Sequence, residues 1–302
     1  GELEKVVRAT PPCARDRPWH SQVPGCIDDA EQHLPGARAY AFRGRYDSTH
    51  RQGICNNSLQ LFRRWAREPD KQLKLNGHTR IGHTTPMPWM CRGNTLNGES
   101  LDTMLGHQSR PCEGPPMDGA GECMRWVYGG SAESNGGREL NRPFVWDAWY
   151  QTKLPTDWLS QYHLHARVEV PARHGYTGQD NVFYAFIPRA CRKGASCRLH
   201  VHLYGCHDAP HNPLDKMGYA RKDARLLTSN YHVWAASNNI VVLYPVSPAN
   251  PRLHSPHPDW GNTGTKACWD AYGETGRDYA TQTGLHMRQI RFAIDALSRG
   301  KI

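Results

Sequence analysis

Runs of apolar and β-branched residues predict strands in the second half of the chain. Residues 181–188 (NVFYAFIP) and 198–205 (RLHVHLYG) form two such runs, joined by the short segment RACRKGASC. Residues 239–245 (NIVVLYP) are apolar almost throughout and are closed by proline, which is typical of a fully buried strand. Cys191 and Cys197 are close enough in the sequence to staple the first two strands as a disulfide-bonded hairpin.

The pattern in the rest of the chain alternates between strand and helix. Residues 37–49 alternate small and aromatic side chains up to Gly44, which predicts a strand followed by a loop that carries Asp47. Helical patterns follow in three segments, namely 55–70, 230–239 and 279–300. Strands that alternate with helices indicate an α/β fold.

The charge of the chain is basic but dispersed. The net charge is +9 and the pI is about 9.1, yet no run of five basic residues occurs. A nucleic-acid arm or a polybasic anchor would show such a run, so we expect a solvated basic surface and no nucleic-acid partner. No stretch of about 18 apolar residues exists either, which excludes a membrane-spanning helix.

Ten cysteines without a zinc-type arrangement favour disulfides in an oxidising compartment. The tripeptide Asn56-Asn57-Ser58 is an N-glycosylation sequon. Together these features predict a secreted protein that is glycosylated at Asn56.

Two polar groupings are candidates for chemistry. Asp47 and His83 follow two early segments in the order acid then histidine, as in a hydrolase triad, although His78 competes with His83 on spacing alone. His200 and His202 lie on the same side of a predicted strand, and with His207 and His211 they could bind a metal. We favour no metal site.

Several longer segments resemble the extracellular poly(3-hydroxybutyrate) depolymerases, which are serine esterases of the α/β-hydrolase type. They follow in the family's order and include a short Cys-Cys loop, a Leu-aromatic-Gly-Cys corner and a Cys-Trp-Asp. The segments are GRYDST (44–49), GHTTP (82–86), DGAGECMRWVYGG (118–130), YAFIPRACRKGASCRLHVHLYGCHDA (184–209), NNIVVLYPVSPAN (238–250) and ACWDAYGETGRDYATQTGLHM (267–287).

The resemblance implies a single domain over residues 1–302 with a circularly permuted α/β-hydrolase fold. It also implies that Asp47 orients His83, that His83 takes the proton from a serine, and that the backbone N–H of Cys206 is an oxyanion donor. Trp269 matches an aromatic residue of the family's substrate cleft, and no cofactor is implied.

The resemblance further assigns disulfides. Cys206 and Cys268 look like the family pair that holds the oxyanion corner. Cys13 and Cys26 are also expected to be disulfide-bonded, whereas the pairing of four other cysteines stays open. These are Cys55, Cys91, Cys112 and Cys123.

The chain departs from the family in two places. No Gly-x-Ser-x-Gly elbow occurs, and Ser100, Ser131 and Ser196 lack the second glycine. We therefore expect the nucleophile strand and helix to be absent from this chain and to be carried by a second, associated chain. The other departure is Tyr204, which stands where the family usually has histidine and which we place among the substrate-binding residues.

Two functions follow from these expectations. The first is a secreted serine-type carboxylic-ester hydrolase that acts on an ester polymer or oligomer and forms the larger piece of a cleaved two-chain enzyme. The alternative is a non-catalytic extracellular protein of the same fold that binds a polymer, a glycan or a partner protein. Intact Asp47 and His83 favour the first, and the absent serine and Tyr204 favour the second.

Overall fold

The computed structural model describes residues 30–47, 52–82, 86, 95–96, 99–100, 117–129, 139–141, 166–169, 182–203, 231–245, 269–270, 273 and 275–299. In chain order the elements are α2 (Ala30–His33), β1 (Ala39–Phe42), α3 (Gln52–Arg63), α4 (Pro69–Gln72), β2 (Leu73–Asn76), β3 (Thr95–Leu96), β4 (Glu99–Ser100), α6 (Gly119–Val127), β5 (Ala166–Glu169), β6 (Val182–Phe186), α8 (Arg189–Arg192), β7 (Arg198–Val201), α10 (Tyr231–Ala236), β8 (Ile240–Tyr244) and α11 (Leu285–Ser298). This mixture of strands and helices confirms the predicted α/β class.

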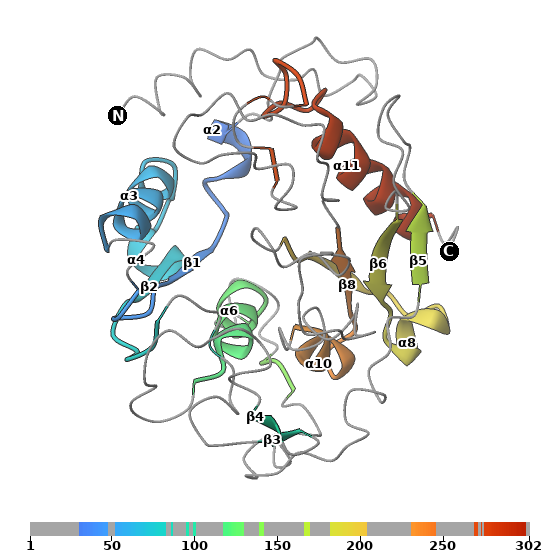
Figure 1. Cartoon of the computed structure of the whole chain (residues 1–302), viewed down its shortest axis with the longest axis horizontal. Helices are drawn as coiled ribbons and strands as arrows, with labels where there is room; N and C mark the ends of the chain where they lie inside the picture. Colours follow the sequence, from blue (N-terminus) through green and yellow to red (C-terminus); the bar gives the residue numbers. More distant parts are fainter. Residues whose placement is uncertain are drawn as a thin grey trace.

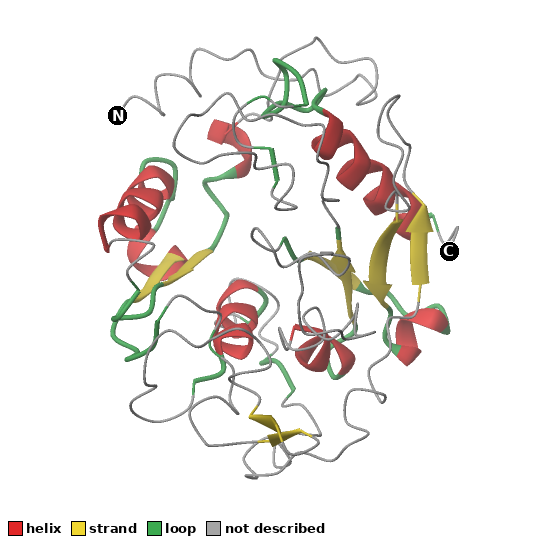
Figure 2. Ribbon diagram, in the orientation of Figure 1, coloured by secondary structure: helices red, strands yellow, loops and turns green. Residues whose placement is uncertain are grey.

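The larger sheet has four strands in the order β5-β6-β8-β7 (Figure 2). Strand β8 pairs antiparallel with β6 and parallel with β7. The predicted hairpin between the segments around β6 and β7 is therefore wrong, because both strands pair with β8 instead. Almost all of β8 is buried, as its apolar sequence predicts, and a strand of this kind is most stable with a neighbour on each side.

A smaller unit is built from β1 and β2, which run parallel in the register Ala39 to Leu73 through Phe42 to Asn76. A parallel pair needs a crossover, and here α3 and α4 supply it. Helix α3 packs against both strands. Strands β3 and β4 form a separate two-residue antiparallel ladder.

Helix α6 lies between the β1–β2 pair and α10, which in turn packs on β8 (Figure 1). The end of α6 contacts the beginnings of two strands. Arg38, just before β1, donates to Trp126 O at 2.8 Å, and Arg198, at the start of β7, donates to Tyr128 O at 3.2 Å. Tyr128 Oη also donates to Leu199 O at 3.1 Å. Two guanidinium groups thus complement the negative end of the helix dipole and join both strand groups.

The start of α6 is fixed by Asp118. Its carboxylate accepts hydrogen bonds from Gly121 N at 2.9 Å and from Trp234 Nε1 of α10 at 2.6 Å. Burial raises the pKa of Asp118, while these hydrogen bonds favour the ionised form. A Cβ at position 121 would lie 2.6 Å from the Trp234 ring, so the glycine is needed for this close approach. Residues 118–122 (DGAGE) therefore make the contacts that hold α6 against α10.

Replacing Asp118 with alanine is expected to lower the free energy of unfolding by about 2 to 4 kcal/mol. The substitution removes an N-cap, which contributes about 1 kcal/mol, and a hydrogen bond to a charged acceptor, which contributes about 1.5 to 3 kcal/mol. Urea denaturation would measure the change. Asp70→Ala is a suitable control because the Asp70 side chain is 91% exposed. Equal stability of the two variants would contradict the role of Asp118.

The described helices include none that is long and apolar enough to cross a membrane.

Candidate functional site

Asp47 lies in a tight turn at the end of β1 and is 8% exposed. Its backbone N–H donates to Gly44 O at 3.1 Å, and its carbonyl oxygen accepts from Arg43 Nη2 at 2.9 Å. Both bonds involve the Asp47 backbone, so they hold the turn without using the carboxylate. The sequence analysis assigned a role to Asp47 and none to Arg43.

The segment that follows β2 runs beside this turn. Arg45 N donates to Thr79 O at 2.8 Å, and Tyr46 N donates to Ile81 O at 3.0 Å. A Cβ at Gly44 would collide with the carbonyl oxygens of Ile81 and Gly82. His83 itself lies outside the described residues, but the residue before it, Gly82, touches the Asp47 turn.

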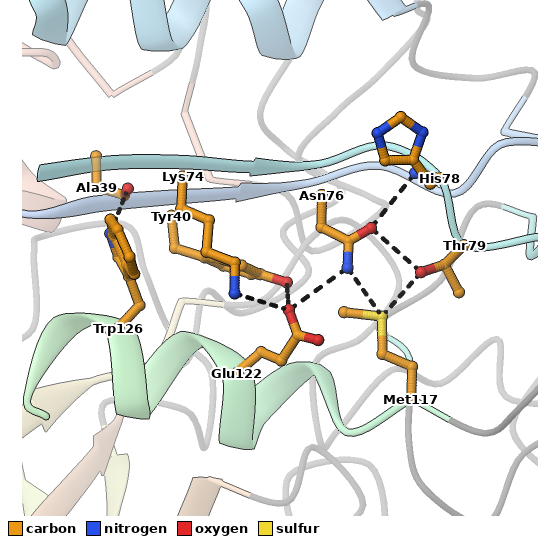
Figure 3. A network of polar contacts seen from close by, with 9 residues as sticks. All are labelled: Ala39, Tyr40, Lys74, Asn76, His78, Thr79, Met117, Glu122 and Trp126. Atoms are coloured by element: carbon orange, nitrogen blue, oxygen red, sulfur yellow. Dashed lines mark hydrogen bonds and ion pairs between the residues drawn. The ribbon is translucent and has the colours of Figure 1, made fainter. Parts of the chain in front are cut away.

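A polar network joins α6 to strands β1 and β2, which lead into the Asp47 turn and the segment before His83, as Figure 3 shows. Glu122 of α6 accepts from Tyr40 Oη at 2.9 Å and from Asn76 Nδ2 at 3.4 Å, and it lies 3.6 Å from Lys74 Nζ. Burial, and then the charge of Glu122, raise the pKa of Tyr40, so its hydroxyl stays a donor. The three donors come from β1 and β2, which explains how α6 is attached to both strands.

The same network shapes the turn that leads from β2 toward His83. Asn76 Oδ1 accepts from Thr79 Oγ1 at 3.2 Å and from His78 N at 3.4 Å. Met117 Sδ, 3.1 Å from Thr79 Oγ1, closes the network from the side of α6. His78 is exposed and contributes its backbone rather than its ring, which points away from Asn76 in Figure 3. Only the motif DGAGE hinted at Glu122 in the sequence.

A cluster of rings lies beside the end of β7. His200 stacks on Tyr231 at a centroid distance of 4.6 Å, and His202 lies 4.7 Å from the same ring. His200 Nδ1 also lies 3.0 Å from Tyr128 Oη. The prediction that the two imidazoles share one side of the strand is confirmed, but their neighbours are tyrosines. Among the residues that the structure describes, no group of three His, Cys, Asp or Glu side chains could hold a metal ion.

Acidification is expected to destabilise the protein through these histidines. Burial lowers the pKa of His200 to about 4, and burial together with the charge of His200 lowers the pKa of His202 to about 3. In the unfolded chain both pKa values are about 6.5, so below that pH the unfolded state binds more protons. The free energy of unfolding is therefore not reduced by these histidines above about pH 6.5. Below that pH it falls by about 1.4 kcal/mol per pH unit for each histidine, down to about pH 4.

Urea denaturation at pH 7 and pH 5 tests this pH dependence. His202→Gln removes one titrating group, so its stability is expected to fall less between the two pH values than that of the parent protein. The same fall in both proteins would show that His202 does not titrate as stated.

The predicted oxyanion corner, residues 203–206, follows β7 and lies outside the described residues except for Leu203. Leu203, the last described residue before Tyr204, is 53% exposed. Tyr204 and Cys206 lie outside the described residues, as do Cys268, Cys13 and Cys26. Their assigned roles stay predictions.

Trp269 packs beside α11. Its ring meets His286 edge-on at a centroid distance of 5.2 Å. The next residue, Asp270, accepts from Gly273 N at 2.8 Å and Thr275 N at 2.6 Å, which fixes the following turn. Burial lowers the pKa of His286, so its imidazole is a neutral support for Trp269.

The remaining sequence predictions concern Cys191, Cys197 and Asn56. Cys191 and Cys197 form a disulfide with a Cα–Cα distance of 5.9 Å, as predicted. Asn56 is exposed on α3, where Ser58 of the same sequon donates to Ile54 O at 3.0 Å. Cys55 and Cys123 are free thiols.

Comparison with known proteins agrees with the family resemblance. No protein-family model matches the chain. The polyhydroxybutyrate depolymerase of Talaromyces funiculosus is 26% identical over 283 residues, which cover 93% of this chain and 70% of that protein. The poly(3-hydroxybutyrate) depolymerase of Delftia acidovorans is 32% identical over 126 residues, or 41% of this chain and 21% of that protein. The chain is a relative of the poly(3-hydroxybutyrate) depolymerases.

The fold of these depolymerases is also the fold of this chain. The crystal structure of the PHB depolymerase from Penicillium funiculosum matches with a TM-score of 0.62 and 21% identity, over 90% of this chain and 74% of that one. A serine-to-alanine variant of PHB depolymerase, complexed with an R3HB trimer, matches with a TM-score of 0.63 and 20% identity, over 91% and 75% of the two chains.

Proposed function

We propose that the protein is a serine-type carboxylic-ester hydrolase that cleaves polyesters or oligoesters of hydroxyalkanoates. The observation that carries the proposal is the backbone pairing of the Asp47 turn with the segment ending at Gly82, one residue before His83. An acid held beside a histidine is what an acyl-transfer site needs, because the acid fixes the imidazole tautomer and stabilises the imidazolium. The relatives' names, and the R3HB trimer bound to one of them, supply the substrate class.

In the proposed reaction His83 removes a proton from a serine hydroxyl as the serine attacks the ester carbonyl. Asp47 stays ionised and orients the ring. The backbone N–H of Cys206 donates to the oxyanion of the tetrahedral intermediate, a contribution of about 3 to 4 kcal/mol to the barrier. His83 then returns the proton to the leaving alcohol, and water releases the acyl group by the reverse sequence. His78 is the weaker candidate because its backbone binds Asn76, farther from Asp47 along the paired segment.

The serine itself would come from a second chain. Within the described residues, β7 is an edge of the four-stranded sheet and β1 is an edge of the smaller pair, and α6 contacts the beginnings of both. A strand added between β1 and β7 would join the two strand groups into one sheet. Its carboxyl end would then lie between the Asp47 turn and the segment that leads to Cys206, where a nucleophile is required. Burying a central strand would provide the apolar contact that keeps two chains associated.

The proposal extends to Trp269, Tyr204 and the extracellular location. Trp269, supported by His286, would contact the acyl chain of the substrate, and Tyr204 would line the same cleft. The Cys191–Cys197 disulfide supports an oxidising compartment and therefore secretion. Glycosylation at the exposed Asn56 is expected, and a mass decrease on treatment with an N-glycosidase would show it.

A fluorophosphonate probe tests the proposed function directly. The native protein is treated with the probe and then analysed by intact and reduced mass spectrometry. We expect the label on a serine of a second polypeptide that copurifies with this chain. A protein that takes up no label and hydrolyses no 3-hydroxybutyrate oligomer would overturn the esterase proposal and leave the non-catalytic binding role.

A further inference from the structure

The loop between β6 and β7 carries an unbalanced group of cations. Residues 189–198, here called the basic loop, contain no acidic residue. Its four cations are Arg189, Arg192, Lys193 and Arg198, all of them exposed. In the part of the chain that the structure describes, none of the four forms an ion pair. Other exposed cations do, such as Arg63 with Asp70 at 2.9 Å and Arg291 with Asp295 at 3.1 Å.

The backbone of the basic loop is held in one conformation. The Cys191–Cys197 disulfide closes it across six residues. Inside it, Lys193 N and Ala195 N both donate to Ala190 O at 3.1 Å, and Gly194 adopts a φ of +89°, which glycine accommodates without strain. At its end, the Arg198 guanidinium lies 5.2 Å from the Tyr128 ring centroid. A loop ordered in advance loses little conformational entropy when it binds a ligand.

The side chains of this loop match a particular ligand chemistry. Arg189 and Arg192 are three residues apart in α8 and so project from the same side of it. Arginine binds sulfate and phosphate groups through two parallel hydrogen bonds, which lysine cannot do. Between the cations the loop offers only alanine, glycine, serine and the disulfide, with no large apolar side chain to anchor a folded protein or enter a lipid surface. The recognition would therefore be electrostatic.

The position of the loop separates it from the candidate active site. The loop ends at Arg198, the first residue of β7, and so lies at the amino end of that strand, whereas Leu203 and the predicted oxyanion corner follow its carboxyl end. In Figure 1 the loop and α8 lie on the far side of β8 and α10 from the β1–β2 pair. A ligand at the basic loop would not occupy the site that contains Asp47.

We propose that the basic loop binds a sulfated polysaccharide. Such a polymer presents closely spaced anionic groups, and it is found outside cells, where a disulfide persists. Nucleic acid offers a similar charge density but is not the polyanion of an oxidising compartment. Binding would hold the protein on a sulfated matrix while leaving the candidate active site accessible.

The test compares two triple variants of the native protein on immobilised heparin and in solution. The first variant is Arg189→Gln, Arg192→Gln and Lys193→Gln. The control is Arg63→Gln, Arg64→Gln and Arg67→Gln on and just after α3, which removes the same charge from another exposed surface. Arg198 is kept because it also supports the end of α6. Equal thermal midpoints of the first variant and the parent protein would establish that the fold is intact.

We expect the first variant to elute at lower salt than the control. Its binding should weaken about tenfold or more at physiological salt, and the slope of log K against log salt should fall by roughly two to three, one for each lost contact. Fully desulfated heparin should not bind the parent protein. If both variants eluted at the same reduced salt concentration, the weaker binding would come from the lower net charge, and the proposal would be overturned. If the parent protein still bound desulfated heparin, or bound duplex DNA more tightly than heparin, the assignment of a sulfated polysaccharide as the ligand would be wrong.

Discussion

Replacing Asp47 with asparagine is expected to lower kcat/KM for ester hydrolysis about 10⁴-fold, because the amide cannot hold the required tautomer of His83 or stabilise the imidazolium. The turn itself should persist, since the bonds from residue 47 N to Gly44 O and from Arg43 Nη2 to residue 47 O involve backbone atoms that the variant keeps. The effect is measured by comparing the hydrolysis of 3-hydroxybutyrate oligomers by the variant and by the parent protein. The rate of fluorophosphonate labelling should fall in parallel.

Asp70→Asn is the matched control for Asp47→Asn. It makes the same chemical change on an exposed carboxylate whose partner, Arg63, is about half exposed. Exposed ion pairs contribute about 0 to 1 kcal/mol, so activity should be unchanged. A loss of less than about tenfold in Asp47→Asn would mean that the carboxylate does not act through His83.

The second large effect is expected from Gly44→Ala. The added Cβ would meet the carbonyl oxygens of Ile81 and Gly82, which belong to backbone and cannot move aside like the end of a flexible side chain. The Asp47 turn would have to separate from the segment that carries His83. We expect a loss of about 10²-fold in kcat/KM from the misplacement, together with about 1 to 3 kcal/mol of stability.

Gly77→Ala separates this effect from a general cost of replacing glycine. Gly77 lies in the turn after β2, close to the same segment, but no heavy atom lies within 4 Å of a Cβ built there. Its substitution should leave activity unchanged and could raise stability by about 0.4 to 1 kcal/mol, through a less flexible unfolded chain. If both variants lose activity equally, the contact between Gly44 and Gly82 does not position the site.

The elements that sequence patterns predicted most closely are those with a clear pattern of apolar positions. Strand β8 lies within the predicted segment 239–245 because that run is apolar almost throughout, and helix α11 lies within 279–300 because apolar residues recur there at helical spacing. The predicted β6–β7 hairpin failed because strand pairing depends on a third segment. A short loop between two strands indicates a hairpin only when no better neighbour exists, and β8 pairs with both.

The candidate site could be predicted from the sequence only where a motif pointed to it. Asp47 followed from a strand ending in an acidic loop, and the structure places it beside the segment before His83. Glu122 could not be found from periodicity, because its role comes from three donors on two strands that lie far from it in sequence. The same is true of the bond from Trp234 to Asp118, which joins residues 116 positions apart.

The central place of β8 also sets the order in which this part of the molecule can fold during synthesis. Strands β6 and β7 have no common neighbour until Ile240 is made, 39 residues after Val201. At about 5 to 20 residues per second, that is a wait of a few seconds, during which, within the described sheet, β6 can pair only with β5 and β7 lacks its neighbour β8. The Cys191–Cys197 bond spans only six residues and can close within that interval. A disulfide that formed in that interval would shorten the connection between β6 and β7 before β8 is inserted between them.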